Sequence, residues 1–425
     1  MRGFLASGLA GALVIVGGWF GWVHADRVDA LIAAAIAPFV SSGADGTRQA
    51  AAGPLPSSAD DPYRALSLDG TEPSPGCVLP GPVGAYGMDQ LMRQLDGEPT
   101  LQGGDHGGSV ALADGRRMFV YGDTIRDVSS VSPFMVRNSV LIAHDGCVEP
   151  VVPPGGGAVI PDDPDGTGHW PMSLRAVEVL GGTKVQVIVN RVRATDAPVG
   201  GTTPESPDSF ETLGSSLATF EIPTDRSPRL VDLVRLTPDG TDPRVPTWGA
   251  AMWEHHGWVY VFGTASDATK STAGWSLHVA RVAPEQLAET DAWQYWDGTE
   301  WVRGRPEAAQ VASARLIPAE QGVSHVLSVF ERDGAWFAVS KEGDFTGDTL
   351  AIWKAPTVTG PWTKHPVRAL ENSAGIRRYT PLAHPDVDLP SGRLLVSWSE
   401  APVVNGLYYT DPGLYRPRFA EVELP

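Results

Sequence analysis

The chain has 425 residues, of which 42% are hydrophobic, with 48 Gly, 37 Pro and a formal net charge of −18. This length allows one large domain with appendages, and the many Gly and Pro residues favour a turn-rich β fold over long helices. The negative charge excludes nucleic acid as a partner, because affinity for a duplex comes mainly from Lys and Arg side chains that neutralise phosphates.

An uncharged apolar run lies at the start of the chain. Residues 4–23 read FLASGLAGALVIVGGWFGWV and follow Arg2. An apolar run of this length can span a bilayer as a helix, and residues 23–25 (VHA) also fit the cleavage site of a signal peptide. An uncleaved anchor and a cleaved signal peptide within residues 1–25 both stay open. In either case we expect the rest of the chain outside the cytoplasm, secreted or anchored to the membrane.

A segment without strand patterns follows. Residues 26–75 are rich in Ala, Ser, Gly, Pro and Asp, and contain one short amphipathic stretch, DRVDALIAAAIAPFV. This composition is typical of a flexible linker, and the amphipathic stretch predicts a short helix within it. The folded domain is therefore expected over residues 76–425.

The chain has two cysteines, Cys77 and Cys147, both in turn-like settings. An even number in an exported protein predicts a disulfide, which would join the segment before the first strand to the first structural unit. Two unpaired thiols are the alternative. Two isolated cysteines cannot form a Cys-rich zinc site.

A repeated strand pattern fills the remainder. Five times the chain gives an alternating strand, a Gly-containing turn, a second strand and, further on, a third. The repeats begin at intervals of about 60 to 80 residues, with their starting points at Asp105, Trp170, Trp248, His325 and His384. The pattern predicts an all-β fold, a five-bladed β-propeller, because such sheets cannot bury their faces alone. A β-sandwich is the competing architecture, and it needs no regular third strand.

The first hairpin places two acids symmetrically. In GGDHGGSVALADGRRMFVYGDT, residues 103–124, Asp105 and Asp123 each lie nine residues from the turn at Asp114. Folding the hairpin brings both carboxylates to the same mouth of the propeller. Such a pair suits glycoside hydrolysis, in which one acid stays protonated while the other attacks the anomeric carbon or activates water. Alternatively, Asp105 is a turn former and Asp123 caps a loop.

The same counting brings further groups to that mouth. Glu400, after the strand LLVSWS, is a third candidate catalytic carboxylate. The candidates for substrate binding are His106, Asn138, His169, Trp170, Trp248, His325 and His384. Indole rings can stack on sugar rings. The alternatives are hydrogen-bonded core histidines, tryptophans that only pack, and an Asn that ends a loop.

Other motifs are missing from the sequence. It contains no GxSxG elbow, HExxH, Walker loop or Rossmann fingerprint. Residues 162–168 (DDPDGTG) lack the ligand spacing of an EF-hand, which favours a surface loop. We therefore expect no cofactor, while a channel cation such as Ca²⁺ stays open.

Several of these segments resemble a known family. VALADGRRMFVYGDT, NSVLIA, WPMS, WQYWDGTEW, IWKAPTVTGPWT and YTPLAHPDVDLPSGRLLVSWSE resemble bacterial five-bladed propeller glycosidases. Among these, the chain is most similar to glycoside hydrolase family 183, formerly a domain of unknown function, whose members include endo-D-arabinanases acting on mycobacterial cell walls. The resemblance covers residues 80–425, and FVYGDT and AHPDVDLPSGRLLVSW are its most specific parts.

The resemblance implies an exported or membrane-tethered enzyme that cuts envelope furanoside polysaccharide, the D-arabinan of arabinogalactan or lipoarabinomannan, from within the chain. It implies that Asp105 is the nucleophile or base and Asp123 the acid. The third blade departs from the wider group of propeller glycosidases, because Glu254 adjoins the far turn. We expect a monomer. A propeller that binds envelope glycan without cleaving it, or one that binds proteins, is the alternative function.

Overall fold

The computed structural model of the chain describes residues 84–129, 131–144, 146–153, 155–195, 210–266, 274–305, 313–373, 375–404 and 407–425. The apolar run 4–23, the predicted linker 26–75 and Cys77 lie outside these ranges. Within them, no helix is long and apolar enough to cross a membrane. Cys147 is not a free thiol, and its pairing with Cys77 stays a prediction.

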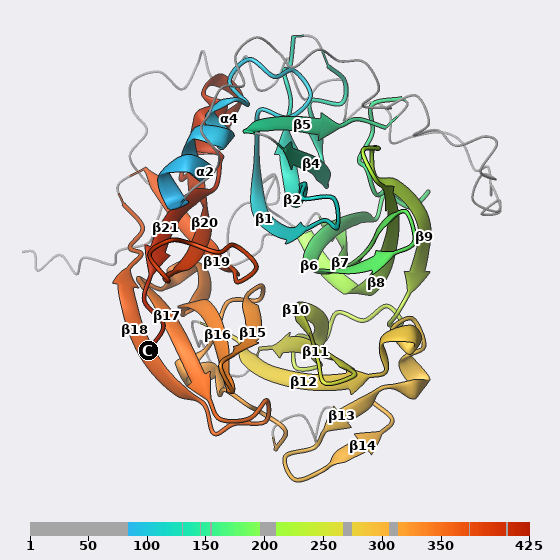
Figure 1. Cartoon of the computed structure of the whole chain (residues 1–425), viewed down its shortest axis with the longest axis vertical. Coiled ribbons are helices and arrows are strands. Elements are labelled where there is room, and N and C mark those ends of the chain that lie inside the picture. Colours follow the sequence, from blue (N-terminus) through green and yellow to red (C-terminus); the bar gives the residue numbers. More distant parts are fainter. Residues whose placement is uncertain are drawn as a thin grey trace, which may run out of the picture. The chain divides into compact units, whose positions relative to one another are not determined.

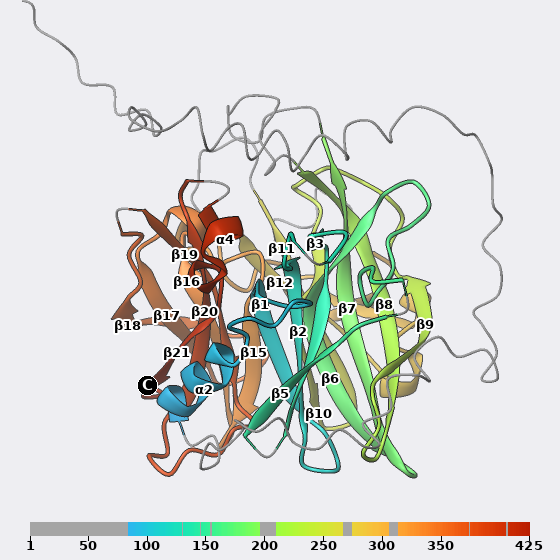
Figure 2. The ribbon, with the colours of Figure 1, turned by 90° about the horizontal axis from the view of Figure 1, so that it is seen from above.

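Five antiparallel sheets are arranged around a common axis, and each is built from one continuous stretch of chain (Figure 1). The first strand of each sheet lies innermost, and these five strands contact one another around the ring. This arrangement confirms the predicted five-bladed β-propeller. Figure 2 shows the sheets from the side.

The first two blades come from the N-terminal half of the propeller. The strands of blade 1 are β1 (Gly103–Ala111), β2 (Arg117–Ile125), the short β3 (Met135–Val136), β4 (Ser139–His144) and β5 (Cys147–Val151). The strands of blade 2 are β6 (Gly168–Val179), β7 (Gly182–Ala194), β8 (Phe210–Pro223) and β9 (Arg229–Arg235).

The other three blades follow in chain order. The strands of blade 3 are β10 (Thr247–His255), β11 (Trp258–Ala265), β12 (Ser276–Val282), β13 (Gln294–Trp296) and β14 (Trp301–Arg303). The strands of blade 4 are β15 (Ser328–Arg332), β16 (Ala335–Glu342), β17 (Thr349–Ala355) and β18 (Thr363–Ala369). The strands of blade 5 are β19 (Ile376–His384), β20 (Leu394–Pro402) and β21 (Arg418–Val422).

Each pair of neighbouring blades buries one hydrophobic cluster between its sheets. Val120 of β2 and Val187 of β7 belong to the cluster between blades 1 and 2, and Phe262 of β11 and Ala338 of β16 belong to the one between blades 3 and 4. The alternating strands supply these apolar faces because successive side chains point to opposite sides of a sheet. The ring is therefore held together mainly by contacts between adjacent sheets.

The predicted start of blade 5 is wrong. The sequence pattern placed the inner strand at His384, whereas β19 runs from Ile376 and ends at His384. Pro381 lies within a β-bulge between Tyr379 and Leu382, where the pairing of β19 with β20 is interrupted. Proline lacks the N–H that pairs neighbouring strands and occurs at such bulges, so the segment does not look like an inner strand from its sequence.

Helix α2 (Gly84–Arg93) closes the ring between the last blade and the first. It contacts β20 and β21 of blade 5 and β5 of blade 1. Leu91 and Met92 of the helix are buried in one cluster with Phe119 of β2 and Phe419 of β21. Sequence patterns did not predict this helix. The described residues include one more short α-helix, α4 (Leu407–Thr410), and the 3₁₀ helices η2 (Pro284–Gln286), η3 (Thr290–Ala292), η4 (Ala319–Gln321), η5 (Asp344–Thr346) and η6 (Pro412–Leu414).

We predict that Leu91→Ala destabilises the propeller by about 2–5 kcal/mol, because it removes a buried side chain and leaves a cavity where blades 1 and 5 meet. Leu91 is only 2% exposed. The free energy of unfolding, measured by urea titration, checks this. Tyr86→Ala on the same helix is the control, since Tyr86 is 75% exposed. Equal stability of the two variants would contradict the closing role of α2.

Candidate active site

A β-bulge places Asp105 beside Asp123. On β1, Gly104 pairs with Thr124 and His106 with Tyr121, so the single residue Asp105 lies opposite two residues of β2, Gly122 and Asp123. A Cβ atom added to Gly122 would lie 2.5 Å from Asp105 Oδ1, so only glycine leaves room for this carboxylate. The hairpin therefore brings both acids to one end of the blade, as expected.

The side chain of Asp123 is 17% exposed. Burial raises the pKa of Asp123 to about 7; the neighbouring Arg137 opposes this rise and the carboxylate of Asp105 adds to it. The indole N–H of Trp170 donates to Asp123 Oδ1 at 2.8 Å, and Arg137 Nη1 lies 3.4 Å from the same oxygen. The raised pKa keeps a proton on Asp123 for about half of the time at neutral pH.

Asp105 sits in a different environment. The hydroxyl of Tyr379 donates to Asp105 Oδ2 at 3.0 Å, and the buried hydroxyl of Tyr415 also lies beside this carboxylate. Burial raises the pKa of Tyr379 well above its usual value, so its proton stays available for this hydrogen bond. Asp105 Oδ1 is buried and has no hydrogen-bond partner among the described residues.

His106 and Trp170 lie next to the pair. The ring of His106 packs edge-on against Trp170, with 6.4 Å between ring centroids, and His106 Nδ1 lies 3.2 Å from the carbonyl oxygen of Pro171. Burial lowers the pKa of His106 even though Asp105 is close, so the imidazole is neutral near pH 7. Trp170 also packs against Phe210 at 4.3 Å. Both predicted residues are thus in the site.

His325 reaches the same end of the channel from blade 4. Its ring centroid lies 6.3 Å from that of His106. His325 Nδ1 lies 3.3 Å from Asp344 Oδ2, and the indole N–H of Trp275 donates to the same oxygen at 2.8 Å. Asp344 thereby orients the imidazole of His325 next to the carboxylate pair.

Three predicted substrate-binding residues lie elsewhere. Trp248 is 3% exposed and packs against Trp293 and Tyr295 in the core of blade 3. The amide of Asn138 donates to the carbonyl oxygens of Ile160 and His169, so it anchors a loop. The same loop covers His169, whose Nδ1 lies 3.1 Å from the Pro161 carbonyl oxygen.

The predicted roles of His384 in substrate binding and of Glu400 in catalysis also differ from what the structure shows. Because His384 ends β19, it lies toward the opposite end of the channel from Asp105, where its two nitrogens bind the hydroxyls of Ser109 and Ser397, each at 2.8 Å. Glu400 is paired with Arg378 at 2.8 Å and with Arg418 at 3.3 Å. These ion pairs hold its carboxylate between the strands of blade 5.

The sequence analysis missed Tyr379, Arg137 and Asp344. Tyr379 could have been found by its place in YTPLAHPDVDLPSGRLLVSWSE, one of the segments that carry the resemblance. Arg137 lies in the turn between β3 and β4, and no pattern indicates that it points toward Asp123. Asp344 has a φ of +52°, an uncommon backbone conformation that only the structure reveals.

Among the described residues, no group of three or more His, Cys, Asp and Glu side chains is arranged to hold a metal ion. A buried pair of carboxyl groups is an arrangement that can serve proton transfer and nucleophilic attack. Asp123 is about half protonated at neutral pH, and a second carboxylate, Asp105, lies on the neighbouring strand. Indole and phenol rings lie beside the two acids. The protein is thus a five-bladed propeller whose candidate active site is a pair of carboxyl groups.

Comparisons with known proteins place the chain in a family. It belongs to the family described as "Domain of unknown function (DUF5005)", whose model matches residues 88–424. A search of curated proteins found no match. This membership leaves the resemblance to glycoside hydrolase family 183 and the specificity for D-arabinan as predictions.

Solved structures share the fold. A protein of Bacteroides ovatus ATCC 8483, whose hydrolase activity is inferred, is 17% identical, with a TM-score of 0.57 over 76% of this chain and 86% of that one. An endo-arabinase from Bacteroides thetaiotaomicron VPI-5482 is 11% identical, with a TM-score of 0.42 over 77% and 96% of the two chains. A protein of unknown function from Dyadobacter fermentans DSM 18053 is 13% identical, with a TM-score of 0.44 over 76% and 83%. At 17% identity, the similarity to the Bacteroides ovatus protein shows a shared fold and nothing about activity. The other two similarities are too low for any conclusion about this chain.

We predict that Asp123→Asn flattens the pH dependence of stability. Folding raises the pKa of Asp123 from 3.8 to about 7, so the folded state is favoured while the group is protonated, and this stability is lost as pH rises from about 4 through about 7. Asn carries no charge. The melting temperature of the variant should therefore rise relative to the wild type across that interval.

The measurement is thermal unfolding at several pH values, with the exposed Asp388→Asn as the matched control. A constant difference between Asp123→Asn and the wild type at all pH values would contradict a raised pKa at Asp123.

Proposed function

We propose that this chain is a glycoside hydrolase that cleaves cell-envelope furanoside polysaccharide. The observation that carries the proposal is the pair formed by Asp105 and Asp123, in which burial and the second carboxylate raise the pKa of Asp123 to about 7. A glycosidase requires this division, since one acid must protonate the leaving oxygen while the other is ionised.

Asp123 is the general acid in this proposal. Its Oδ1 accepts hydrogen bonds from Trp170 and Arg137, which leaves Oδ2 to carry the proton toward the glycosidic oxygen. Trp170 fixes the orientation of the carboxyl group. The leaving sugar departs with the proton, and Asp123 becomes a carboxylate that can then activate water.

Asp105 is the nucleophile. Tyr379 holds the carboxylate through Oδ2, and in this proposal the carboxylate attacks the anomeric carbon and forms the glycosyl-enzyme bond. Water, deprotonated by Asp123, then breaks that bond and releases Asp105. Acids on neighbouring strands of one hairpin favour this double displacement with retention of configuration, for which the carboxyl groups are about 5 Å apart.

The surroundings of the pair suit a sugar chain. Trp170 with Phe210 lies on one side of the acids, and Phe345 packs near Tyr379 on the other, with 5.1 Å between ring centroids. Such rings give flat apolar surfaces with polar edges, as sugar rings require. The resemblance of the YTPLAHPDVDLPSGRLLVSWSE and FVYGDT segments supports D-arabinan as the polymer and cleavage within the chain.

The proposed substrate requires export. The apolar run 4–23 after Arg2 supports a location outside the cytoplasm, either as a secreted protein or one anchored by this run. Protease treatment of intact cells that express the full chain tests this: the propeller should be degraded while a cytoplasmic marker survives. Protection of both proteins would count against export.

We predict that Asp105→Asn and Asp123→Asn each lower the release of oligosaccharides from arabinogalactan by about 10³-fold or more, because each removes one half of the acid and nucleophile pair. Product release by the full chain, followed by chromatography, checks this, with Asp388→Asn as the control. Fresh product of the wild type should show retained anomeric configuration by NMR. Wild-type activity in both Asn variants, or glycan binding without any product, would overturn the proposed function.

We predict that hydrolysis by the wild type declines as pH rises above about 7, because Asp123 then loses the proton it must donate. Trp170→Phe removes the N–H that donates to the charged carboxylate, so the pKa of Asp123 should rise further and the decline should move to higher pH. The pH dependence of kcat/KM measures both effects. A shift to lower pH in Trp170→Phe would contradict the assignment of Asp123 as the acid.

A further inference from the structure

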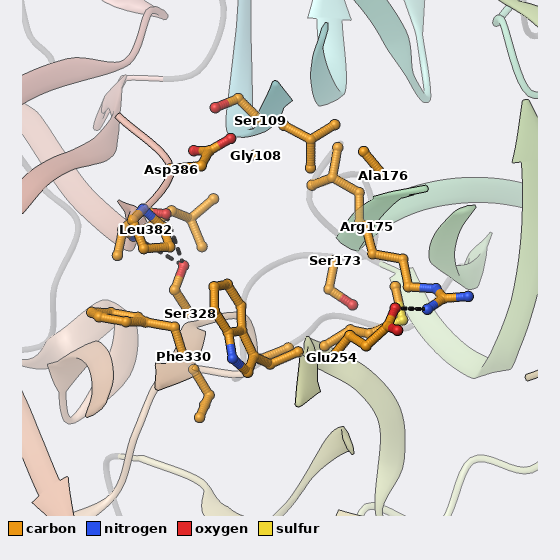
Figure 3. Close-up of a pocket in the computed structure, with 18 of the residues that line it drawn as sticks. Gly108, Ser109, Ser173, Arg175, Ala176, Glu254, Ser328, Phe330, Leu382 and Asp386 are labelled. Carbon is orange, nitrogen blue, oxygen red and sulfur yellow. Dashed lines mark hydrogen bonds and ion pairs between the residues drawn. The ribbon is translucent and has the colours of Figure 1, made fainter. Parts of the chain in front are cut away.

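A second chamber lies in the channel, on the far side from the two acids. It has a volume of about 360 Å³ and is lined by the later parts of the inner strands, with Gly108–Ala111 of β1 and Ser173–Ala176 of β6 among them. Figure 3 shows Ser109 and Asp386 on one side of this lower chamber and Arg175 with Glu254 on the other. Its volume is within the range of small-molecule sites.

A hydrophobic plug separates the lower chamber from the candidate active site. Met172, Val326 and Leu382 come from three blades and pack together as one buried cluster. The residue before each of the first two, Pro171 or His325, contacts the active-site groups. The residue after each plug member, such as Ser173, lines the lower chamber. A ligand in the lower chamber therefore does not touch Asp105 or Asp123.

The charged groups of the lower chamber compensate one another. Arg175 is paired with Glu254, and Arg117 with Asp386 at 3.0 Å. The guanidinium group of Arg175 also donates to Gln186 and to the carbonyl of Pro284. Because each cation has a carboxylate partner, the walls favour a ligand without net charge.

The serine hydroxyls of the lower chamber use their protons on the protein, so toward a ligand they can only accept hydrogen bonds. The hydroxyl of Ser173 donates to the carbonyl oxygen of Gly249 at 2.7 Å, and that of Ser328 is bonded to the backbone of Ala383. Glu254 is 46% exposed and has one oxygen paired with Arg175. A ligand that fits these walls must therefore supply donors for these oxygens, as a polyol does.

One side of the lower chamber is an indole. Trp253 of β10 lines it and is held edge-on against Phe330, with 6.1 Å between ring centroids. An apolar ring, acceptor oxygens and zero net charge are what a neutral sugar matches with its C–H face and its hydroxyl groups. We propose that the lower chamber is a second binding site, specific for a neutral mono- or disaccharide and independent of the carboxylate pair.

The test uses the full chain carrying Asp123→Asn, so that the candidate active site does not hydrolyse the sugar that is used as the probe. Each of D-arabinose, D-xylose, D-glucose and cellobiose is titrated alone, and binding is followed by saturation-transfer NMR. Trp253→Ala should weaken binding of the preferred sugar by about tenfold or more. Ala176→Trp, at the half-buried edge of the chamber, should block it and serves if Trp253→Ala does not fold.

The matched control is Trp258→Ala, at the start of β11, which removes an indole outside the chamber and should leave binding unchanged. Saturation transfer to none of the four sugars at about 50 mM would overturn the proposal. So would binding that persists in Ala176→Trp, or binding that is lost in Trp170→Ala but not in Trp253→Ala. These outcomes concern only the lower chamber, so its failure leaves the proposed hydrolase untouched.

Discussion

The burial of Asp123 beside a second carboxylate, that of Asp105, is the constraint on which the upper end of the channel depends. Asp105 and Asp123 cannot both be ionised at little cost while Asp123 is buried, and the structure assigns them different partners. Tyr379 donates to one acid, whereas Trp170 and Arg137 donate to the other. The imidazole of His106, which packs against Trp170 beside the pair, is neutral near pH 7.

Irregular inner strands make this arrangement possible. Four of the five inner strands carry a β-bulge near their start, at Gly104, Pro171, Trp248 and Tyr379, and the fifth begins only at Ser328. A bulge turns a side chain out of the regular alternation. The irregularity between β1 and β2 sets Asp105 opposite Gly122 and Asp123. Two members of the plug also lie at bulges, Met172 within that of β6 and Leu382 at the end of that of β19. One kind of backbone irregularity thus creates the acid pair and divides the channel.

Local patterns in the sequence predicted some of these features and missed others. The pairing of Asp105 with Asp123 was predictable because both are symmetric about the Asp114 turn, and a hairpin converts that symmetry into proximity. The burial of Trp248 and the ion pairs of Glu400 depend on neighbouring strands far away in sequence. The inner strand of blade 5 was predicted too late in the chain because Pro381 makes the segment unlike a strand. For the same reason Tyr379, which lies on this strand, was not predicted as a site residue. Side-chain direction at a bulge cannot be read from alternation, since a bulge is the point where alternation fails.

The seam at helix α2 has a consequence for the order of folding. The N–H of Ala85 lies 3.4 Å from Glu421 Oε1, a contact that joins positions 336 residues apart. During synthesis α2 emerges long before β21, so blade 1 can cover part of its apolar face early, whereas the cover from blade 5 is added only when the chain is nearly complete. Each blade can form from its own segment as it is synthesised, but the ring closes last. A nascent chain that stops before β21 therefore leaves apolar side chains of α2 exposed to chaperones.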